Sequence, residues 1–183
     1  MGWKRLTVFV IILSFFIVFG CSEDTEEPPT EEPIVDPPAE QPVDDPSLPL
    51  APDFTLLDTE LKEVSLKDYN GKVLLLDFWA TWCKPCEEEV PIFIQLYNQY
   101  RAQGFEMVGI SLDEDGLKAI EPFAKKIGVN YTILLAQPGL VEKYNVSVIP
   151  SAFLINRHGR LVKRFDGAQG DKVPYEEALK KLL

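Results

Sequence analysis

Two cysteines, Cys83 and Cys86, are separated by only two residues, and at that spacing they could carry thiol–disulfide chemistry. The near-continuous apolar run Val73–Trp79 precedes them, and a helical pattern follows them. If Pro85 opens that helix, Cys83 lies at its N-terminus, where backbone N–H groups and the helix dipole favour negative charge. A thiol in that position loses its proton more readily, and the thiolate is the reactive form. The second sulfur, one turn further on, can then close a disulfide with the first.

Two other interpretations of the pair stay open, a static disulfide and half of a zinc site. A disulfide at this spacing closes a very small loop, so it adds little entropic stability. A zinc site needs further ligands, and the single histidine of the chain, His158, belongs to a distant turn. Redox chemistry therefore explains the pair better, and we predict no metal here.

Strand-like and helix-like patterns alternate along the chain and position the dithiol at the carboxyl end of a buried strand. The loop at residues 113–116 (Asp-Glu-Asp-Gly) is expected to cap the helix that follows it. The expected strands cover residues 54–57, 63–66, 73–79, 105–112, 132–135, 152–155 and 161–165, and the expected helices cover residues 86–101, 117–126, 141–144 and 175–183.

This order predicts an α/β fold, with a mixed central sheet and helices on both of its faces. The first two strands would form an N-terminal β-hairpin extension, and the last two an antiparallel hairpin around residues 156–159. We expect this folded domain to occupy residues 52–183.

Residues 1–20 have the pattern of an export signal. Lys4 and Arg5 are followed by an apolar stretch over residues 6–19, which is shorter than the about 20 residues of a transmembrane helix. The stretch ends in Val-Phe-Gly before Cys21, which resembles the bacterial lipoprotein signal, in which that cysteine receives lipid. An uncleaved short anchor and an ordinary cleaved signal are the alternatives. All three would place the domain outside the cytoplasm, and lipidation of Cys21 would anchor it to the cell membrane.

An acidic, proline-rich linker is expected over residues 21–51. The formal net charge of the chain is −11, and residues 23–45 contain ten acids and no Lys or Arg. Such a segment buries too little apolar surface to fold, and its prolines and charges keep it extended. The remaining sequence has no basic patch that would favour nucleic acid as a partner.

The segment at residues 77–86, Asp-Phe-Trp-Ala-Thr-Trp-Cys-Lys-Pro-Cys, resembles the active-site segment of thioredoxins. Residues 148–151 (Val-Ile-Pro-Ser) precede a strand, as the cis-proline loop does in that fold. Glu89 and Pro91 follow the cysteines in a Trp-Cys-x-Pro-Cys-x-x-Glu-x-Pro pattern. Together with the export signal, these features resemble the TlpA/ResA-type family of membrane-anchored, extracytoplasmic thiol–disulfide reductases. The resemblance covers residues 52–183 and implies a thioredoxin fold.

The resemblance also implies roles for the residues around the dithiol. Cys83 is expected to be the attacking thiolate, and Cys86 to resolve the mixed disulfide with the substrate. Glu89 matches the acidic residue of the family and could exchange protons with the buried thiol, unless it is an ordinary solvated residue. Asp77 aligns with the buried acid of cytoplasmic thioredoxins and could accept the proton of Cys86. The alternative is a strand-end carboxylate bonded to backbone amides.

Five further residues are expected to contact the substrate. Pro150 should follow a cis peptide bond after Ile149, and this would leave a backbone edge on which an extended substrate segment can pair. Trp82 offers flat apolar contact beside the sulfur. Lys84 would favour the thiolate unless it is simply solvated, and Lys84 with Pro85 between the cysteines suggests a thioredoxin-like reductant.

The resemblance implies that the substrates are exported proteins with a cysteine pair, such as an apocytochrome c, and that a membrane thiol carrier supplies electrons. No bound cofactor is expected, because the dithiol itself cycles. A peroxiredoxin-like thiol peroxidase and a metal-delivery module are the weaker alternatives. Peroxiredoxin-like proteins usually place a Thr three residues before the reactive Cys, whereas Thr81 lies two before Cys83. Related copper-handling proteins separate their cysteines by three residues rather than two.

Overall fold

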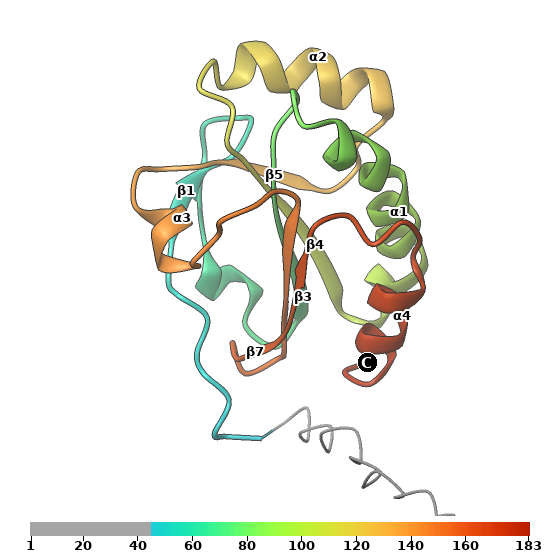
Figure 1. The fold of residues 1–183 in the computed structure, drawn as a ribbon. Helices are drawn as coiled ribbons and strands as arrows, with labels where there is room; N and C mark the ends of the chain where they lie inside the picture. The colour runs from blue at the N-terminus through green and yellow to red at the C-terminus, as the bar shows by residue number, and fades with distance from the viewer. Residues whose placement is uncertain (1–44) are drawn as a thin grey trace, which may run out of the picture. The chain divides into compact units, whose positions relative to one another are not determined.

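A five-stranded mixed sheet forms the centre of the domain in the computed structural model, which describes residues 45–183 (Figure 1). The strand order is β5-β4-β3-β6-β7. The first three of these are parallel to one another, and β6 is antiparallel to both β3 and β7. The strands are β3 (Val73–Trp79), β4 (Phe105–Ser111), β5 (Thr132–Leu135), β6 (Ser151–Ile155) and β7 (Leu161–Asp166).

The middle strand, β3, leads directly to the dithiol. All seven of its residues are buried, as its apolar sequence predicts for a strand covered on both faces. Phe78 of β3 lies opposite Ser151 of β6, so the proline loop that precedes β6 comes beside the carboxyl end of β3. Two segments that are distant in sequence therefore meet at this end of the sheet.

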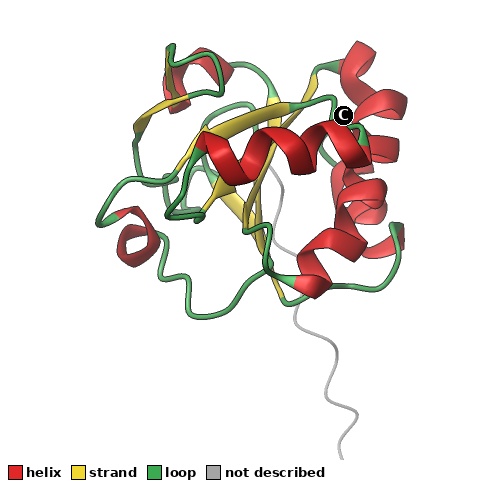
Figure 2. Cartoon of the chain, turned by 90° about the horizontal axis from the view of Figure 1, so that it is seen from above, coloured by secondary structure: helices red, strands yellow, loops and turns green. Residues whose placement is uncertain are grey.

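Helices cover both faces of the sheet, as the sequence predicted (Figure 2). Side chains alternate across a strand, so Val73 and Leu75 face one side while Leu74 and Leu76 face the other. The first pair packs in a core with α1 and α4, and the second packs with α3 and the N-terminal hairpin. The helices are α1 (Lys84–Tyr100), α2 (Leu117–Ile127), α3 (Leu140–Lys143) and α4 (Val173–Lys180), with short 3₁₀ turns at Leu66–Tyr69 and Arg101–Gln103.

The predicted N-terminal hairpin is confirmed. Strands β1 (Thr55–Leu57) and β2 (Glu63–Ser65) pair antiparallel and form a separate two-stranded sheet. An isolated bridge between Asp58 and Leu134 joins the end of this hairpin to β5. The hairpin thus covers part of the outer edge of the central sheet, where backbone groups would otherwise lack partners.

Residues just before 52, which the sequence assigned to the linker, contact the β6–β7 hairpin. Leu50 forms a bridge with Arg160, and the Ala51 N–H donates to Gly159 O at 2.9 Å. The side chains of Leu48 and Ala51 are buried. These apolar side chains indicate that the segment packs on the domain, but the many prolines and acids around them favoured the prediction of a linker.

The predictions for the export signal at residues 1–20, for Cys21 and for the rest of the linker lie outside the described residues. Within residues 45–183, no helix is long and apolar enough to cross a membrane.

Candidate active site

The two cysteines lie at the start of α1 and are joined by a disulfide, with their Cα atoms 5.2 Å apart. Cys83 is the N-cap residue, and its Sγ accepts a hydrogen bond from the Cys86 N–H at 3.3 Å. Pro85 stands in the first turn, where its missing N–H costs no helical hydrogen bond. Both cysteines are buried, Cys83 slightly less than Cys86. On reduction, a thiolate at Cys83 would keep this N–H donor and the positive end of the helix dipole.

The residues that the sequence predicted to contact the substrate differ in how they lie around the dithiol. The Ile149–Pro150 peptide bond is cis, which confirms that prediction. Ile149 packs against the buried cluster that contains both cysteines, and Trp82 is 69% exposed beside them. Lys84 points to its own helix and forms an ion pair with Glu87 at 3.1 Å, so its charge is partly compensated.

Asp77 lies on the same face of β3 as Val73 and Leu75, the face that α1 covers. Its carboxyl group is buried, and Oδ1 has no hydrogen-bond partner among the described residues. Burial raises the pKa of Asp77 well above its ordinary value, and the negative charge of Glu89 raises it further. Since no backbone amide donates to Oδ1, the alternative of an amide-bonded carboxylate does not describe this oxygen.

Glu89 is buried, with 1% of its surface exposed, so it is not the solvated helix residue of the alternative interpretation. Its Oε1 accepts hydrogen bonds from the Tyr175 hydroxyl at 2.5 Å and from the Gln169 N–H at 3.0 Å. Its Oε2 is buried without a partner among the described residues. Burial raises the pKa of Glu89, and the two hydrogen bonds act against that rise. The site therefore contains two buried carboxyl groups, Asp77 below the dithiol and Glu89 one helical turn beyond it.

The predicted loop 113–116 does contain the N-cap of α2, but the carboxylate of Asp113 bonds elsewhere. The N-cap is Gly116, and no side chain bonds there. Instead, Asp113 accepts hydrogen bonds from the Thr81 N–H at 3.0 Å and from the Thr81 and Ser111 hydroxyls at 2.5 and 2.7 Å. Because these donors come from the loop before Cys83 and from the end of β4, the carboxylate ties the dithiol loop to the sheet.

The sequence alone did not mark Gly109 of β4 as a residue of the site. It pairs with Asp77, and a Cβ at Gly109 would come within 2.7 Å of Trp79 Nε1. The indole of Trp79 is buried in the cluster with both cysteines, so it has little room to move. Tyr175 and Gln169 were also missed, because no local pattern links them to a helix that lies 80 or more residues earlier.

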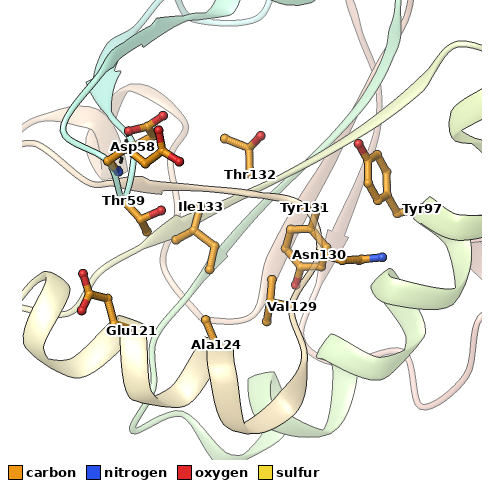
Figure 3. Close-up of a pocket in the computed structure, with 11 residues that line it drawn as sticks. Asp58, Thr59, Tyr97, Glu121, Ala124, Val129, Asn130, Tyr131, Thr132 and Ile133 are labelled. Atoms are coloured by element: carbon orange, nitrogen blue, oxygen red, sulfur yellow. Dashed lines mark hydrogen bonds between the residues drawn. The ribbon is translucent and has the colours of Figure 1, made fainter.

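A cavity of about 430 Å³ is lined by residues of α2 and β5, among others (Figure 3). Figure 3 shows Glu121 and Ala124 of α2 on one side of it and Ile133 of β5 with Tyr131 on the other. None of the cysteines or buried acids lines it.

Among residues 45–183, no group of three or more His, Cys, Asp or Glu side chains is arranged to hold a metal ion. The turn position predicted for His158 is confirmed by its N–H, which donates to Asn156 Oδ1 at 3.0 Å.

The contacts of Asp113 lead to a stability prediction. Asp113→Ala removes the acceptor of three hydrogen bonds to a charged group, so we expect the free energy of unfolding to fall by about 1.5–3 kcal/mol. Urea unfolding of the oxidised domain measures the loss. The matched control is Asp115→Ala, because Asp115 is exposed in the same loop and its change should stay within about 0.5 kcal/mol. Equal losses in the two variants would show that the bonds of Asp113 are not the cause.

Comparison with known proteins agrees with this geometry. Residues 49–164 match the model of the AhpC/TSA family. The chain is 37% identical over 133 residues to "Thiol-disulfide oxidoreductase ResA" of Bacillus thuringiensis subsp. konkukian, which covers 72% of this chain and 76% of the relative. It is 36% identical over 127 residues to the protein of the same name from Bacillus subtilis, which covers 69% of this chain and 70% of that one.

Among solved structures, a putative thiol:disulfide interchange protein DsbE from Chlorobium tepidum superposes with a TM-score of 0.69 at 32% sequence identity. The superposition covers 74% of this chain and 97% of that protein. The mixed sheet, the dithiol at the end of β3 and the cis-proline loop beside it are thus placed in a known fold, the thioredoxin fold. The chain belongs to the AhpC/TSA family, and within it to the ResA-type thiol–disulfide oxidoreductases.

Proposed function

We propose that the chain reduces disulfides in exported proteins outside the cytoplasm, tethered to a membrane, with Cys83 as the attacking thiolate and Cys86 as the resolving thiol. The observation that carries the proposal is the position of Cys83 at the N-cap of α1, bonded to Cys86 and accepting its N–H. A thiolate at that position is stabilised by the helix N-terminus, while the second sulfur stays buried within reach.

In the first step the Cys83 thiolate attacks one sulfur of the substrate disulfide. The substrate S–S bond breaks, a mixed disulfide forms, and the second substrate sulfur leaves as a thiolate that takes a proton from solvent. In the second step Cys86 loses its proton and attacks Cys83 Sγ. The mixed disulfide breaks, the substrate leaves as a dithiol, and the Cys83–Cys86 disulfide closes. Two electrons have moved from the dithiol to the substrate, so no further cofactor is needed.

The buried carboxyl groups of Asp77 and Glu89 are the proposed proton acceptors for Cys86. Both belong to elements that meet at the dithiol, and a buried thiol cannot release its proton to water directly. Glu89 receives two hydrogen bonds that favour its ionised form, so it ionises at lower pH than Asp77. Asp77 keeps its proton longer, because the charge on Glu89 opposes its ionisation.

The substrate would bind along the surface formed by Trp82 and the cis-proline loop. Trp82 and Val148 are exposed large apolar side chains, 69% and 47% respectively. The backbone at Ile149 and Pro150 gives an extended segment a strand-like edge on which to pair, next to the sulfur that attacks. Main-chain pairing of this kind tolerates many sequences, which suits an enzyme that reduces more than one exported protein, an apocytochrome c among them.

The place of action is proposed from the N-terminal sequence. An export signal that ends at Cys21, a lipidated cysteine and an acidic linker would hold the domain at the outer face of a membrane. In a compartment that favours disulfides, the oxidised enzyme must be reduced again, so a membrane thiol carrier is the proposed electron donor.

Trapping in whole cells tests this proposal. In the full chain, Cys86→Ser should stall the first step, so mixed disulfides with exported proteins accumulate in the membrane fraction and disappear on treatment with dithiothreitol. The additional change Cys21→Ala should move the trapped species to the soluble exported fraction. The double variant Cys83→Ser/Cys86→Ser is the control and should trap nothing. Adducts with cytoplasmic proteins alone would overturn the proposed location.

A further inference from the structure

Only one of the two carboxylate oxygens of Glu89 receives hydrogen bonds. Two donors, the Tyr175 hydroxyl at 2.5 Å and the Gln169 N–H at 3.0 Å, both bond to Oε1. The other oxygen, Oε2, is buried and receives no hydrogen bond among the described residues. A buried acceptor without a donor is costly, so this arrangement needs a reason beyond stability.

The two donors are fixed by their own surroundings. The Tyr175 ring, from α4, packs between Phe93 at 5.1 Å and Phe165 at 4.5 Å between ring centroids, and it is 2% exposed. Gln169 lies between β7 and α4, and its side-chain Nε2 donates to Gly167 O at 2.8 Å, which holds the loop. The hydroxyl and the amide therefore keep their positions and determine where Oε1 lies.

The Glu89 side chain projects from the same face of α1 as Cys86, because it follows Cys86 by three residues. Helical side chains lean toward the N-terminus of their helix, which brings the Glu89 side chain over the turn that contains Cys86. The titratable groups around this carboxyl are Cys86 on α1, Asp77 on β3, Tyr175 on α4 and Tyr131 before β5.

We propose that Tyr175 and the backbone amide of Gln169 position Glu89, so that Oε1 is held and Oε2 takes the proton of the Cys86 thiol when the disulfide closes. Tyr175 is a positioning residue, since it acts through Glu89 and does not touch the sulfur atoms. The inference rests on the proposed roles of Cys86 and Glu89. It assigns to the C-terminal helix α4 a part in the redox step that the dithiol motif alone does not contain.

The step balances in protons and electrons. With the small disulfide 5,5′-dithiobis(2-nitrobenzoate) as oxidant, Cys83 attacks and releases one thionitrobenzoate. The Cys86 S–H bond then breaks as Glu89 Oε2 takes the proton. The Cys86 thiolate attacks Cys83 Sγ, and the second thionitrobenzoate leaves with the electron pair of the broken S–S bond. The rate of this second release reports the closing step without any protein substrate.

Tyr175→Phe tests the inference, because it removes the hydroxyl and keeps the ring between Phe93 and Phe165. The lost hydrogen bond favours ionised Glu89, so its removal raises the pKa of that carboxyl, and the rate-against-pH curve of the second release should shift upward by about one pH unit. The matched control is Tyr100→Phe. The Tyr100 hydroxyl donates to Glu176 at 2.5 Å and also joins α1 to α4, but it lies away from the dithiol.

We expect both variants to lose some thermal stability and only Tyr175→Phe to move the pH curve. An unmoved curve in Tyr175→Phe, or an equal shift in Tyr100→Phe, would overturn the inference and leave Tyr175 with a structural role. A different result would contradict the proposed function. A domain that closes its disulfide with the expected curve but reduces no protein disulfide would contradict the proposed function and leave the positioning of Glu89 intact.

Discussion

Cys83→Ser should abolish the reduction of insulin disulfides by the purified domain while leaving the fold in place. The hydroxyl of serine is a far weaker nucleophile than a thiolate, so the first step is lost and the rate should fall to that of the reductant alone. The fold should survive because serine is a favoured N-cap residue, and its Oγ can accept the Cys86 N–H that Cys83 Sγ accepts now. Insulin precipitation in the presence of dithiothreitol measures the activity, and circular dichroism checks the fold.

Two measurements sharpen this expectation. Cys86→Ser should also lose turnover, yet it should still release one thionitrobenzoate from 5,5′-dithiobis(2-nitrobenzoate), whereas Cys83→Ser should release little. The wild-type domain should consume hydrogen peroxide only slowly. Rapid consumption of peroxide with negligible reduction of insulin would instead favour a thiol peroxidase.

Asp77→Asn should make the oxidised domain more stable at neutral pH and, once reduced, slower to close its disulfide above the folded pKa of Asp77. Burial and the charge of Glu89 raise the folded-state pKa of Asp77 above the ordinary value of 3.8. The folded protein therefore keeps this proton while the unfolded chain has lost it. The contribution of Asp77 to stability is present below the unfolded pKa and is lost as the pH rises toward the folded pKa.

Asparagine has nearly the same shape and does not ionise, so the variant escapes that loss. The stability difference between Asp77→Asn and wild type should be small at acidic pH and should grow by about 1.4 kcal/mol per pH unit between the two pKa values. Urea unfolding at several pH values measures it. Disulfide closure should slow at a pH above the folded pKa of Asp77, where its carboxylate can accept the thiol proton, and the loss should be only about ten-fold, less than is usual for a lost proton acceptor, because Glu89 remains.

Glu88→Gln is the matched control for Asp77→Asn. Glu88 is an exposed carboxylate on α1, so its replacement should change neither the dependence of stability on pH nor the rate of closure. If the stability difference for Asp77→Asn is the same at every pH, Asp77 has the same pKa in the folded and unfolded states and is not the buried acid described above.

The fold was predictable because strong local patterns and short connections agree with one another. The apolar run of β3, the dithiol after it and Pro150 before β6 are local features, and each lies where the sequence predicted. Their meeting point follows from strand order, which the resemblance to thioredoxins supplied. Asp77 was predicted as a buried acid for the same reason.

The remaining part of the site depends on contacts between distant segments. Tyr175 reaches Glu89 across 86 residues, and Asp113 reaches Thr81 across 32. An Asp before a helix is a common capping residue, so the loop 113–116 was predicted to cap α2, and the N-cap does lie there, at Gly116. The structure gives the carboxylate of Asp113 three donors elsewhere, which satisfy it better than one helix end would.

The pairing of residues 48–51 with the β6–β7 turn has a consequence for how a tethered enzyme can work. Leu74 lies opposite Ile155 and Phe78 opposite Ser151, so this turn is at the start of β3 and the dithiol is at its other end, about 20 Å away. If the chain is tethered as proposed, a tether that joins the domain there would hold it by the end remote from its reactive sulfur. Such an enzyme would meet soluble partners without reorienting but would have to turn over to meet the proposed reductant in the membrane. The linker expected before residue 45 would permit that turn, so shortening it should impair re-reduction before it impairs contact with substrates.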